Sequence, residues 1–391
     1  MDFERPFLLI ESTSSGELQV NQEALDVLNS IRQPVVVVSI VGMYRTGKSY
    51  LMNRLAGKQT GFPVGSTKGI WMWCVLHPHK DDQTLVLLDT EGLGDVARGD
   101  QAHDTWIFSL AVLLSSTFVY NSMGTINNEA VMSLHYVTEL TEHIKVKPSE
   151  EKEDDTAEKF IRFFPTFVWT VRDFTLELKF DGEAVTADDY LENSLKLVKG
   201  NSKHAAYSNG PRECIRNYFP TRKCFVFDQP ASKEKLRIIE ELTDADLEPA
   251  FVRQTLEFCS YIFKHSKEKT MTGGYKVTGQ MLGNLAVTYV DAIRSGSVPC
   301  LENAVAALSL IENPAAVEES FALYRRLLGE RVKLHTETQE ELSSTHEGCL
   351  KEALQLFMKR SFKDNDQNFQ RDLMVRYISD LRRVVFSERM K

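Results

Sequence analysis

The sequence predicts an α/β fold in which a mostly parallel sheet with helices on both faces is followed by an all-α domain. A β-branched run at residues 35–41 indicates a buried strand. Further short apolar runs alternate with helical segments, which is typical of a parallel sheet with crossover helices. From residue 279 onward the strand signals cease and apolar residues recur at spacings of three and four.

The individual elements follow in order along the chain. An extended segment at 7–10 and a helix around 23–31 precede the first strand. The later predicted strands are short apolar runs at 70–75, 84–88, 117–120, 167–171 and 224–227. The predicted helices between them lie at 50–56, 106–114 and 132–140. An acidic stretch at 149–158 is expected to be a solvated loop.

A change of composition near residue 267 marks the predicted boundary, so that a domain at 1–268 is followed by a helical domain at 275–391. The predicted helices of the second domain lie at 282–293, 301–311, 317–328, 350–362 and 369–386. Pro314 is placed in the first turn of the helix that follows it, where a proline is tolerated. The last helix reaches the end of the chain, and we expect this domain to be incomplete.

The composition narrows the class of function. A hydrophobic content of 42% and a charged content of 26% are typical of a soluble globular protein. The net charge of −9 without a basic run argues against a nucleic-acid partner. The six scattered cysteines favour reduced thiols over a disulfide framework or a zinc site. We see no secretory signal, membrane span or prenylation cysteine, and therefore expect a cytoplasmic chain whose membrane contact would be indirect.

A phosphate-binding loop is predicted directly after the first strand. Residues 42–49, GMYRTGKS, match G-x-x-x-x-G-K-[ST] between a strand and a helix. Gly42 and Gly47 would let backbone N–H groups point at phosphate, and the helix N-terminus would add positive charge. Lys48 would bridge the terminal phosphates, and the Ser49 hydroxyl would bind Mg²⁺. The context of strand and helix favours this interpretation over a chance match.

A second polar group follows the strand at 84–88. Asp89 begins the sequence DTEGLG, and a carboxylate at such a strand end can hold Mg²⁺ through water. Ligands of parallel sheets bind at the carboxyl ends of the strands. Gly42, Asp89 and Asp173 are all predicted to lie at this edge.

Three motifs together resemble the interferon-inducible guanylate-binding proteins, a family of dynamin-like large GTPases. They are GMYRTGKS at 42–49, DTEGLGD at 89–95 and TVRDF at 170–174. The resemblance implies a P-loop GTPase domain that binds GTP and Mg²⁺ and cleaves GTP to GDP, and in some members to GMP. It also implies homodimers or hetero-oligomers with related GTPases, and a role in innate immune defence at vesicles or pathogen-containing compartments.

The resemblance also assigns roles to particular residues. The implied catalytic residues are Arg45, Lys48 and Glu91, and the implied metal ligands are Ser49, Thr67 and Asp89. The implied nucleotide-binding residues are Gly42, Met43, Tyr44, Arg45, Thr46, Gly47, Lys48, Ser49, Val64, Gly65, Ser66, Asp89, Thr90, Glu91, Gly92, Leu93, Arg172 and Asp173.

Asp173 would accept hydrogen bonds from the ring N–H and the exocyclic amine of guanine, with Arg172 over the base. A surface ion pair of Arg172 and Asp173 is the alternative. Arg45 would fold over the phosphates as an internal arginine finger when two GTPase domains meet face to face. An arginine in this role is worth about 10³ to 10⁵ in rate. The alternative is that Arg45 is a solvated loop residue.

The chain departs from the family in the segment before residue 70, which is about five residues shorter than the family pattern. The missing part carries the serine that positions the attacking water, and Thr67 can be aligned with either of two family threonines. We therefore expect nucleotide binding to persist and hydrolysis to be slowed or lost. We expect the family's long C-terminal helices and lipidated tail to be missing from this chain. By the resemblance, Gln229 stands where the guanine cap has an arginine.

Two alternatives follow from these features. One is a hydrolysis-impaired guanine-nucleotide-binding module that acts by pairing with intact relatives. The other is a P-loop kinase or ATPase with a helical appendage, which equal competition by ATP and GTP would favour.

Overall fold

The computed structural model describes residues 4–13, 15–63, 68–94, 101–144, 164–200, 202–271, 274–332 and 339–389. The chain forms two compact units, residues 1–302 and residues 303–391, and each is considered by itself. In the described ranges no helix is both long and apolar enough to cross a membrane.

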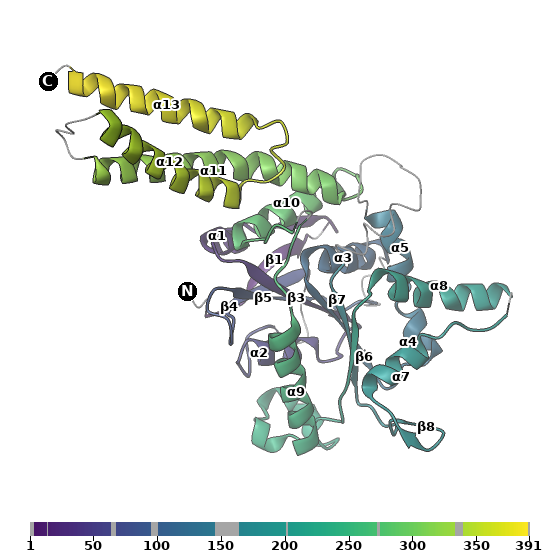
Figure 1. Cartoon of the computed structure of the whole chain (residues 1–391). Helices are drawn as coiled ribbons and strands as arrows, with labels where there is room; N and C mark the ends of the chain where they lie inside the picture. Colours follow the sequence, from purple (N-terminus) through teal and green to yellow (C-terminus); the bar gives the residue numbers. More distant parts are fainter. Residues whose placement is uncertain are drawn as a thin grey trace. The chain divides into compact units, whose positions relative to one another are not determined.

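Within the described part of the first unit, eight strands form one sheet in the order β10-β7-β6-β3-β5-β4-β1-β2 (Figure 1). The five strands from β10 to β5 in this order run parallel, whereas β4, β1 and β2 pair antiparallel. The bounds are β1 (Phe7–Ser12), β2 (Leu18–Val20), β3 (Val35–Gly42), β4 (Ile70–Leu76), β5 (Thr84–Thr90), β6 (Thr117–Met123), β7 (Thr166–Arg172) and β10 (Arg222–Val226). A separate hairpin consists of β8 (Lys179–Phe180) and β9 (Glu183–Ala184). The predicted mostly parallel sheet is confirmed.

The helices of this unit are α1 (Gln22–Ser30), α2 (Lys48–Leu55), α3 (Gln101–Leu114), α4 (Asn128–Met132), α5 (Tyr136–His143), α7 (Ala187–Ser194), α8 (Lys203–Tyr218), α9 (Pro249–His265) and α10 (Gly279–Arg294). Two short 3₁₀ helices are η1 (Lys235–Glu241) and η2 (Asp244–Asp246). The single helix predicted at 132–140 is wrong, because α4 and α5 are separate there. The Ser133 hydroxyl donates to the Glu129 carbonyl at 3.0 Å, and this bond helps α4 to end.

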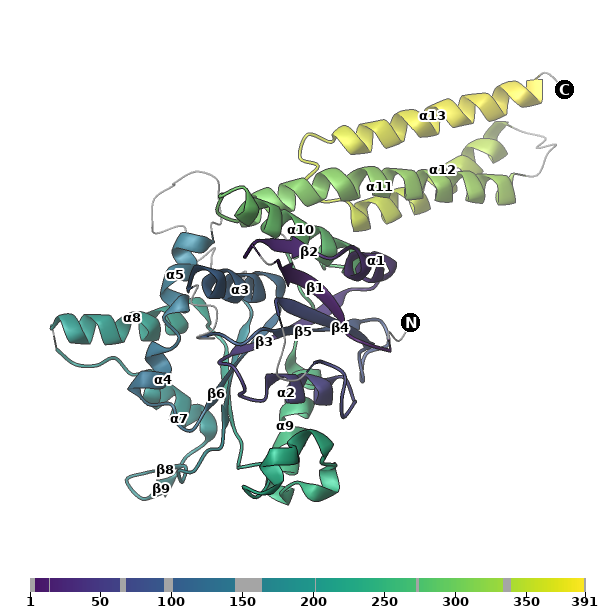
Figure 2. The same ribbon diagram turned by 180° about the vertical axis from the view of Figure 1, so that it is seen from behind.

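The central strand β3 is buried along its whole length. On one face Val36, Val38 and Ile40 pack in one apolar cluster with residues of α2 and α9. On the other face the Ser39 hydroxyl donates to the Ala111 carbonyl of α3 at 3.1 Å. Figures 1 and 2 show the helices arranged on both faces of the sheet. Because both faces are covered, β3 is apolar apart from Ser39 and does not alternate with polar residues.

The second unit is built from three long helices in its described part: α11 (Leu301–Arg331), α12 (Gln339–Arg360) and α13 (Asn368–Arg389). The predicted break near Pro314 is wrong, because α11 continues through it. The neighbouring Asn313 is fully buried and makes two hydrogen bonds to the Phe362 backbone. Its Nδ2 donates to the carbonyl at 2.8 Å, and its Oδ1 accepts from the N–H at 3.0 Å. These contacts offset the helical bond that a proline cannot make.

The predicted division at residues 268–275 stays a prediction. In the structure α10 packs against α1 and β2 within the first unit.

Candidate nucleotide-binding site

The predicted phosphate loop joins β3 to α2. Gly42 lies against β6 so closely that a Cβ would collide with the Asn121 carbonyl, and Gly47 has a left-handed φ of 80°. The Asn121 Nδ2 donates to the Thr46 carbonyl at 2.8 Å, and the Thr46 hydroxyl donates to the Met43 carbonyl at 2.8 Å. Two glycines and one amide therefore fix the loop.

The Lys48 ammonium group lies inside this loop. It is buried, and its Nζ donates to the carbonyls of Gly42 and Met43 at 3.1 Å each. Burial lowers the pKa of Lys48, while the nearby carboxylates of Asp89 and Glu91 oppose that shift. A cation held by loop carbonyls at the head of α2 is suited to bind phosphate oxygens.

Ser49 and Asp89 meet beside Lys48. The Ser49 hydroxyl donates to Asp89 Oδ2 at 2.6 Å, and Asp89 is fully buried. Burial raises the pKa of Asp89 to about 6, against the opposing effects of Lys48 and the Ser49 hydroxyl. Asp89 Oδ1 has no hydrogen-bond partner among the described residues. A hydroxyl and an unsatisfied carboxylate oxygen are hard oxygen donors, so the two side chains fit Mg²⁺.

The other predicted residues around this metal site are placed only in part. Four predicted residues lie outside the described residues: Val64, Gly65, Ser66 and Thr67. Thr67 is the third predicted metal ligand. Among the residues that are described, no group of three or more His, Cys, Asp or Glu side chains forms a metal cluster. Of the described residues, Ser49 and Asp89 are the ones that would bind a cation here, together with ligand or water oxygens.

Residues 90–93 run alongside the loop. The Leu93 N–H donates to the Gly42 carbonyl at 3.1 Å, and a Cβ on Gly92 would lie 2.5 Å from Tyr44 Cα. The Thr90 hydroxyl donates to the Ile40 carbonyl at 2.8 Å inside the sheet. Any nucleotide contact of residues 90–93 would thus come from the backbone rather than from the Thr90 hydroxyl.

Glu91, predicted to be catalytic, is buried. Its Oε2 accepts from the Gly69 N–H at 2.6 Å, and its Oε1 pairs with His103 Nε2. Its own backbone N–H donates to the Gly69 carbonyl at 2.9 Å. The carboxylate therefore joins β5 to the start of β4 and to α3.

Arg172 and Asp173 end β7 at the same edge of the sheet. Arg172 is only 5% exposed, so the alternative of a surface ion pair is wrong. Its guanidinium carbon lies 5.0 to 5.5 Å from the ring centres of three aromatic residues, Tyr50, Phe227 and Phe251. Burial lowers the pKa of Arg172 to about 10 against the effects of Tyr50 and Asp173.

The same guanidinium supports the phosphate loop. Its Nη2 lies 3.3 Å from the position that a Cβ on Gly47 would take, and its Nη1 has no hydrogen-bond partner among the described residues. Asp173 follows with a φ of 52°, which is uncommon outside glycine and is enriched at functional positions.

Arg45, the predicted arginine finger, is exposed. Its φ is 59° and its guanidinium carbon lies 5.2 Å from the ring centre of the half-exposed Tyr44. This arrangement matches the alternative of a solvated loop residue, whereas the finger role concerns a dimer and stays a prediction.

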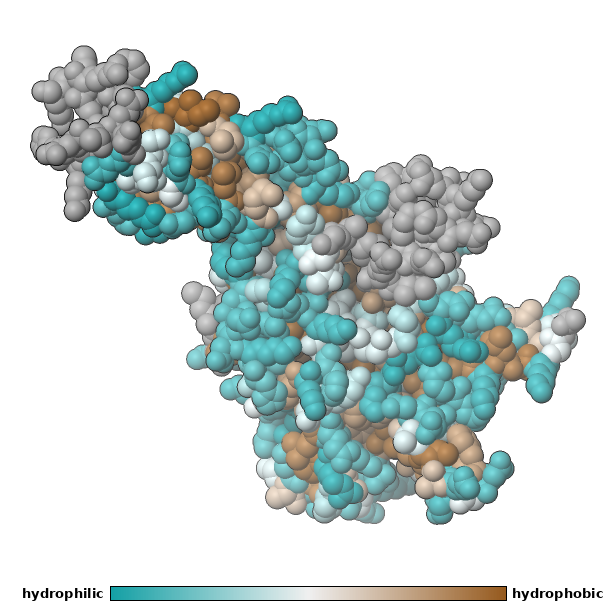
Figure 3. All heavy atoms as spheres, viewed as in Figure 1, coloured by the Kyte–Doolittle hydropathy of each residue, from teal (hydrophilic) through white to brown (hydrophobic). Residues whose placement is uncertain are grey.

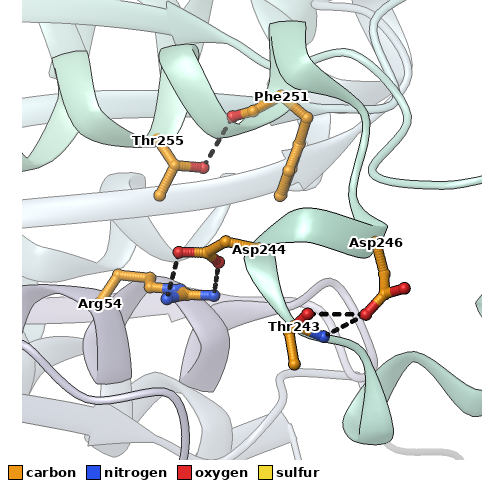
Figure 4. Close-up of polar contacts among 6 residues, drawn as sticks. All are labelled: Arg54, Thr243, Asp244, Asp246, Phe251 and Thr255. Carbon is orange, nitrogen blue, oxygen red and sulfur yellow. Dashed lines mark hydrogen bonds and ion pairs between the residues drawn. The ribbon is translucent and has the colours of Figure 1, made fainter.

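One ion pair, which joins α2 to η2, was not predicted from the sequence. Figure 4 shows the Arg54 guanidinium of α2 facing the Asp244 carboxylate, with Nη1 donating to Oδ2 at 3.1 Å and Nη2 paired with Oδ1. In the same view Asp246 accepts from the Thr243 hydroxyl at 2.7 Å. The two partners of the ion pair lie too far apart in the chain for spacing to reveal them.

Asn121 is a second site residue that was not predicted. Its Oδ1 accepts from the Thr170 hydroxyl of β7 at 2.8 Å, while its Nδ2 holds the phosphate loop. The only signal for this role in the sequence was an amide residue near the end of the apolar strand β6. The structure shows that this amide is buried.

The geometry can now be compared with known proteins. Residues 15–271 match the family model "Guanylate-binding protein, N-terminal domain", and residues 273–382 match "Guanylate-binding protein, C-terminal domain". The chain is 60% identical over 375 residues to Guanylate-binding protein 2 of Homo sapiens, covering 94% of this chain and 63% of the relative. For Guanylate-binding protein 6 of Homo sapiens these values are 58% over 377 residues, 94% and 59%.

Guanylate-binding protein 7 of Mus musculus is 55% identical over 381 residues, covering 96% of this chain and 60% of the relative. The chain thus spans about three fifths of the length of these relatives. Both family models and all three relatives agree, and this chain belongs to the guanylate-binding protein family.

Proposed function

We propose that this chain binds guanine nucleotides with Mg²⁺ and hydrolyses GTP to GDP. The observation that carries the proposal is the meeting of Lys48, Ser49 and Asp89 at the head of α2, where Asp89 Oδ1 has no partner among the described residues. Bound Mg²⁺ would neutralise charge on the phosphates. Ser49 and Asp89 would hold it, and Lys48 would exchange its carbonyl partners for phosphate oxygens.

Guanine preference is assigned to Asp173. Its position after β7, at the edge that holds Gly42 and Asp89, supports this assignment, because ligands of parallel sheets bind there. An aspartate carboxylate accepts two hydrogen bonds from guanine that adenine does not offer.

The first experiment measures the affinity of the purified chain for fluorescent GDP and a non-hydrolysable GTP analogue, with and without Mg²⁺. We expect GTP to displace the probe at far lower concentration than ATP, and Lys48→Ala to lose binding. Asp173→Asn should shift preference to xanthine nucleotides. No measurable affinity for guanine nucleotides with Mg²⁺ would overturn the proposal, and equal competition by ATP would favour a kinase or ATPase.

We also propose that hydrolysis is slow. One feature supports this: the segment before residue 70 is about five residues shorter than the family pattern. The related alternative is a module that binds nucleotide without cleaving it and pairs with intact relatives. Single-turnover hydrolysis of GTP, measured on the chain alone and mixed with an intact relative, separates these outcomes.

Self-association and a role in innate immune defence rest on family membership alone. We propose homodimers or mixed oligomers formed through the first unit, and a cytoplasmic pool that is recruited to vesicles or pathogen-containing compartments. Sizing in GDP, a GTP analogue and a fluoride transition-state mimic tests assembly. A monomer in all three conditions, or a tagged chain that stays diffuse in infected cells, would count against these roles.

A further inference from the structure

Two consecutive residues of α3 hold the two ends of residues 91–94. His103 Nε2 pairs with Glu91 Oε1 at the first end. At the second end, Asp104 Oδ2 accepts a hydrogen bond of 2.7 Å from the Gly94 N–H. We call these two residues the α3 clamp. None of the roles described so far includes them.

The first contact lies at a meeting point of four chain segments. The Glu91 carboxylate also accepts from the Gly69 N–H at 2.6 Å, and His103 Nε2 lies 3.2 Å from the Ser12 hydroxyl at the end of β1. Glu91 is buried there, and each of its two carboxylate oxygens has a partner, Gly69 for one and His103 for the other. Buried and hydrogen-bonded groups of this kind hold one orientation, because breaking one contact leaves an unsatisfied polar atom.

Residues of α5 support the second contact. Asp104 Oδ2 also lies 3.2 Å from the Tyr136 hydroxyl of α5, and the following residue, Thr105, donates to Glu139 of α5 at 2.9 Å. Farther along α3, Ile107 and Phe108 are fully buried. The two residues of the α3 clamp therefore lie on a helix that is anchored by its packing in the core.

Between its two held ends the segment lies directly on the phosphate loop. Leu93 and Met43 form a parallel bridge, and the Leu93 N–H donates to the Gly42 carbonyl at 3.1 Å. The α3 clamp thus sets the position of residues 91–94 relative to the loop in which Lys48 lies. None of these contacts comes from the nucleotide-binding side chains themselves.

We propose that His103 and Asp104 are positioning residues that hold residues 91–94 in register with the phosphate loop and so support GTP cleavage without contributing to nucleotide affinity. This inference rests on the proposed hydrolysis. Displacing a catalytic segment by about 1 Å can lower a rate by about 10². Binding depends mainly on the loop and on Lys48, which the clamp does not touch.

The test uses the full chain and measures both the affinity for a non-hydrolysable GTP analogue and the single-turnover rate. We expect His103→Ala and Asp104→Ala each to lower the rate by about tenfold or more, with affinity changed by less than about twofold. His103→Gln keeps an N–H donor and should recover most of the rate. The double variant should lose little more than either single variant, because both act on one segment.

His79→Ala is the matched control, since His79 is exposed in the turn between β4 and β5, at the opposite end of these strands. A full rate in His103→Ala, a faster rate, or equal losses of affinity and rate would overturn the inference. So would a His103→Gln variant that is as slow as His103→Ala.

A second readout separates this inference from the proposed function. Amide hydrogen exchange of residues 89–94 should be about tenfold faster in His103→Ala and Asp104→Ala than in the wild type and His79→Ala. If the wild type binds nucleotide but does not cleave it, the proposed hydrolysis fails. The clamp is then judged by exchange alone, and unchanged exchange in both variants would overturn it.

Discussion

The Ser49 hydroxyl donates a hydrogen bond of 2.6 Å to Asp89 Oδ2, and this bond joins the first turn of α2 to the end of β5. The two residues come from different motifs, yet the parallel pairing of β3 with β5 brings them to one edge of the sheet. Their contact orients the carboxylate so that Oδ1 stays without a hydrogen-bond partner among the described residues. A site prepared in this way favours ligand binding at the expense of the stability of the protein itself.

Asp89→Asn should therefore stabilise the protein near neutral pH. Burial raises the pKa of Asp89 from 3.8 to about 6, so between these values the folded state binds more protons than the unfolded state. The free energy of unfolding then falls as the pH rises through this window, by about 3 kcal/mol in total.

Asp89→Asn should remove this fall in the free energy of unfolding. Urea unfolding of both proteins at about pH 4 and about pH 7, with no added Mg²⁺, measures the difference. A variant that is less stable than the wild type at pH 7 would contradict the assignment. The same variant should lose the Mg²⁺ dependence of nucleotide binding.

Arg172→Met should separate stability from nucleotide affinity. The guanidinium is buried among three rings and its Nη1 has no partner among the described residues, so an unbranched apolar methionine should cost little stability. Because Arg172 also lies against Gly47, we expect the affinity for GDP to fall by about tenfold. Thermal unfolding and fluorescent GDP titration measure the two effects, and a large loss of stability with unchanged affinity would reverse this interpretation.

Arg54→Ala should loosen η2 with a modest effect on the whole domain. Arg54 is 15% exposed and Asp244 is 50% exposed, so solvent screens the pair and the expected loss is about 1 kcal/mol. Arg54→Lys should not recover it, because an ammonium group cannot bind both carboxylate oxygens in the same plane. Hydrogen exchange at residues 243–248 should rise in both variants, and unchanged exchange would show that the pair does not hold this segment.

Lys269→Met should change the pH dependence of the free energy of unfolding in the opposite direction to Asp89→Asn. Lys269 is buried, and its Nζ donates to the Ser115 carbonyl at 3.1 Å. Burial lowers its pKa from 10.5 to about 7, so the unfolded state binds more protons between these values. The free energy of unfolding of the wild type should therefore rise as the pH increases from about 7 to about 10. Urea unfolding across this range should show a smaller rise in the methionine variant, and equal slopes would refute this role.

Much of the first unit could be predicted because its strands are buried on both faces. Such strands appear in the sequence as continuous apolar runs, and β3, β5 and β7 lie where those runs are. The direction of a strand is not encoded in this way, so the antiparallel pairing of β4 with β5 could not be foreseen. Helix α8 escaped prediction because Gly210 and Pro211 interrupt its pattern.

The site was predictable where one local motif builds it and not where distant segments meet. The phosphate loop and Asp89 follow from strand ends and spacing. The burial of Arg172 depends on Tyr50, Phe227 and Phe251, which only the tertiary fold brings together. Likewise Pro314 predicts a helix start, and only the contact of Asn313 with Phe362 explains why α11 continues.

The two hydrogen bonds of Asn121 have a mechanical consequence. Its side-chain nitrogen donates to the phosphate loop. Its side-chain oxygen accepts from β7, the strand that leads to Asp173. A shift of the loop would therefore pull on the strand that Asp173 follows. Asn121 thus couples the phosphate loop to β7, so that a displacement of one is transmitted to the other.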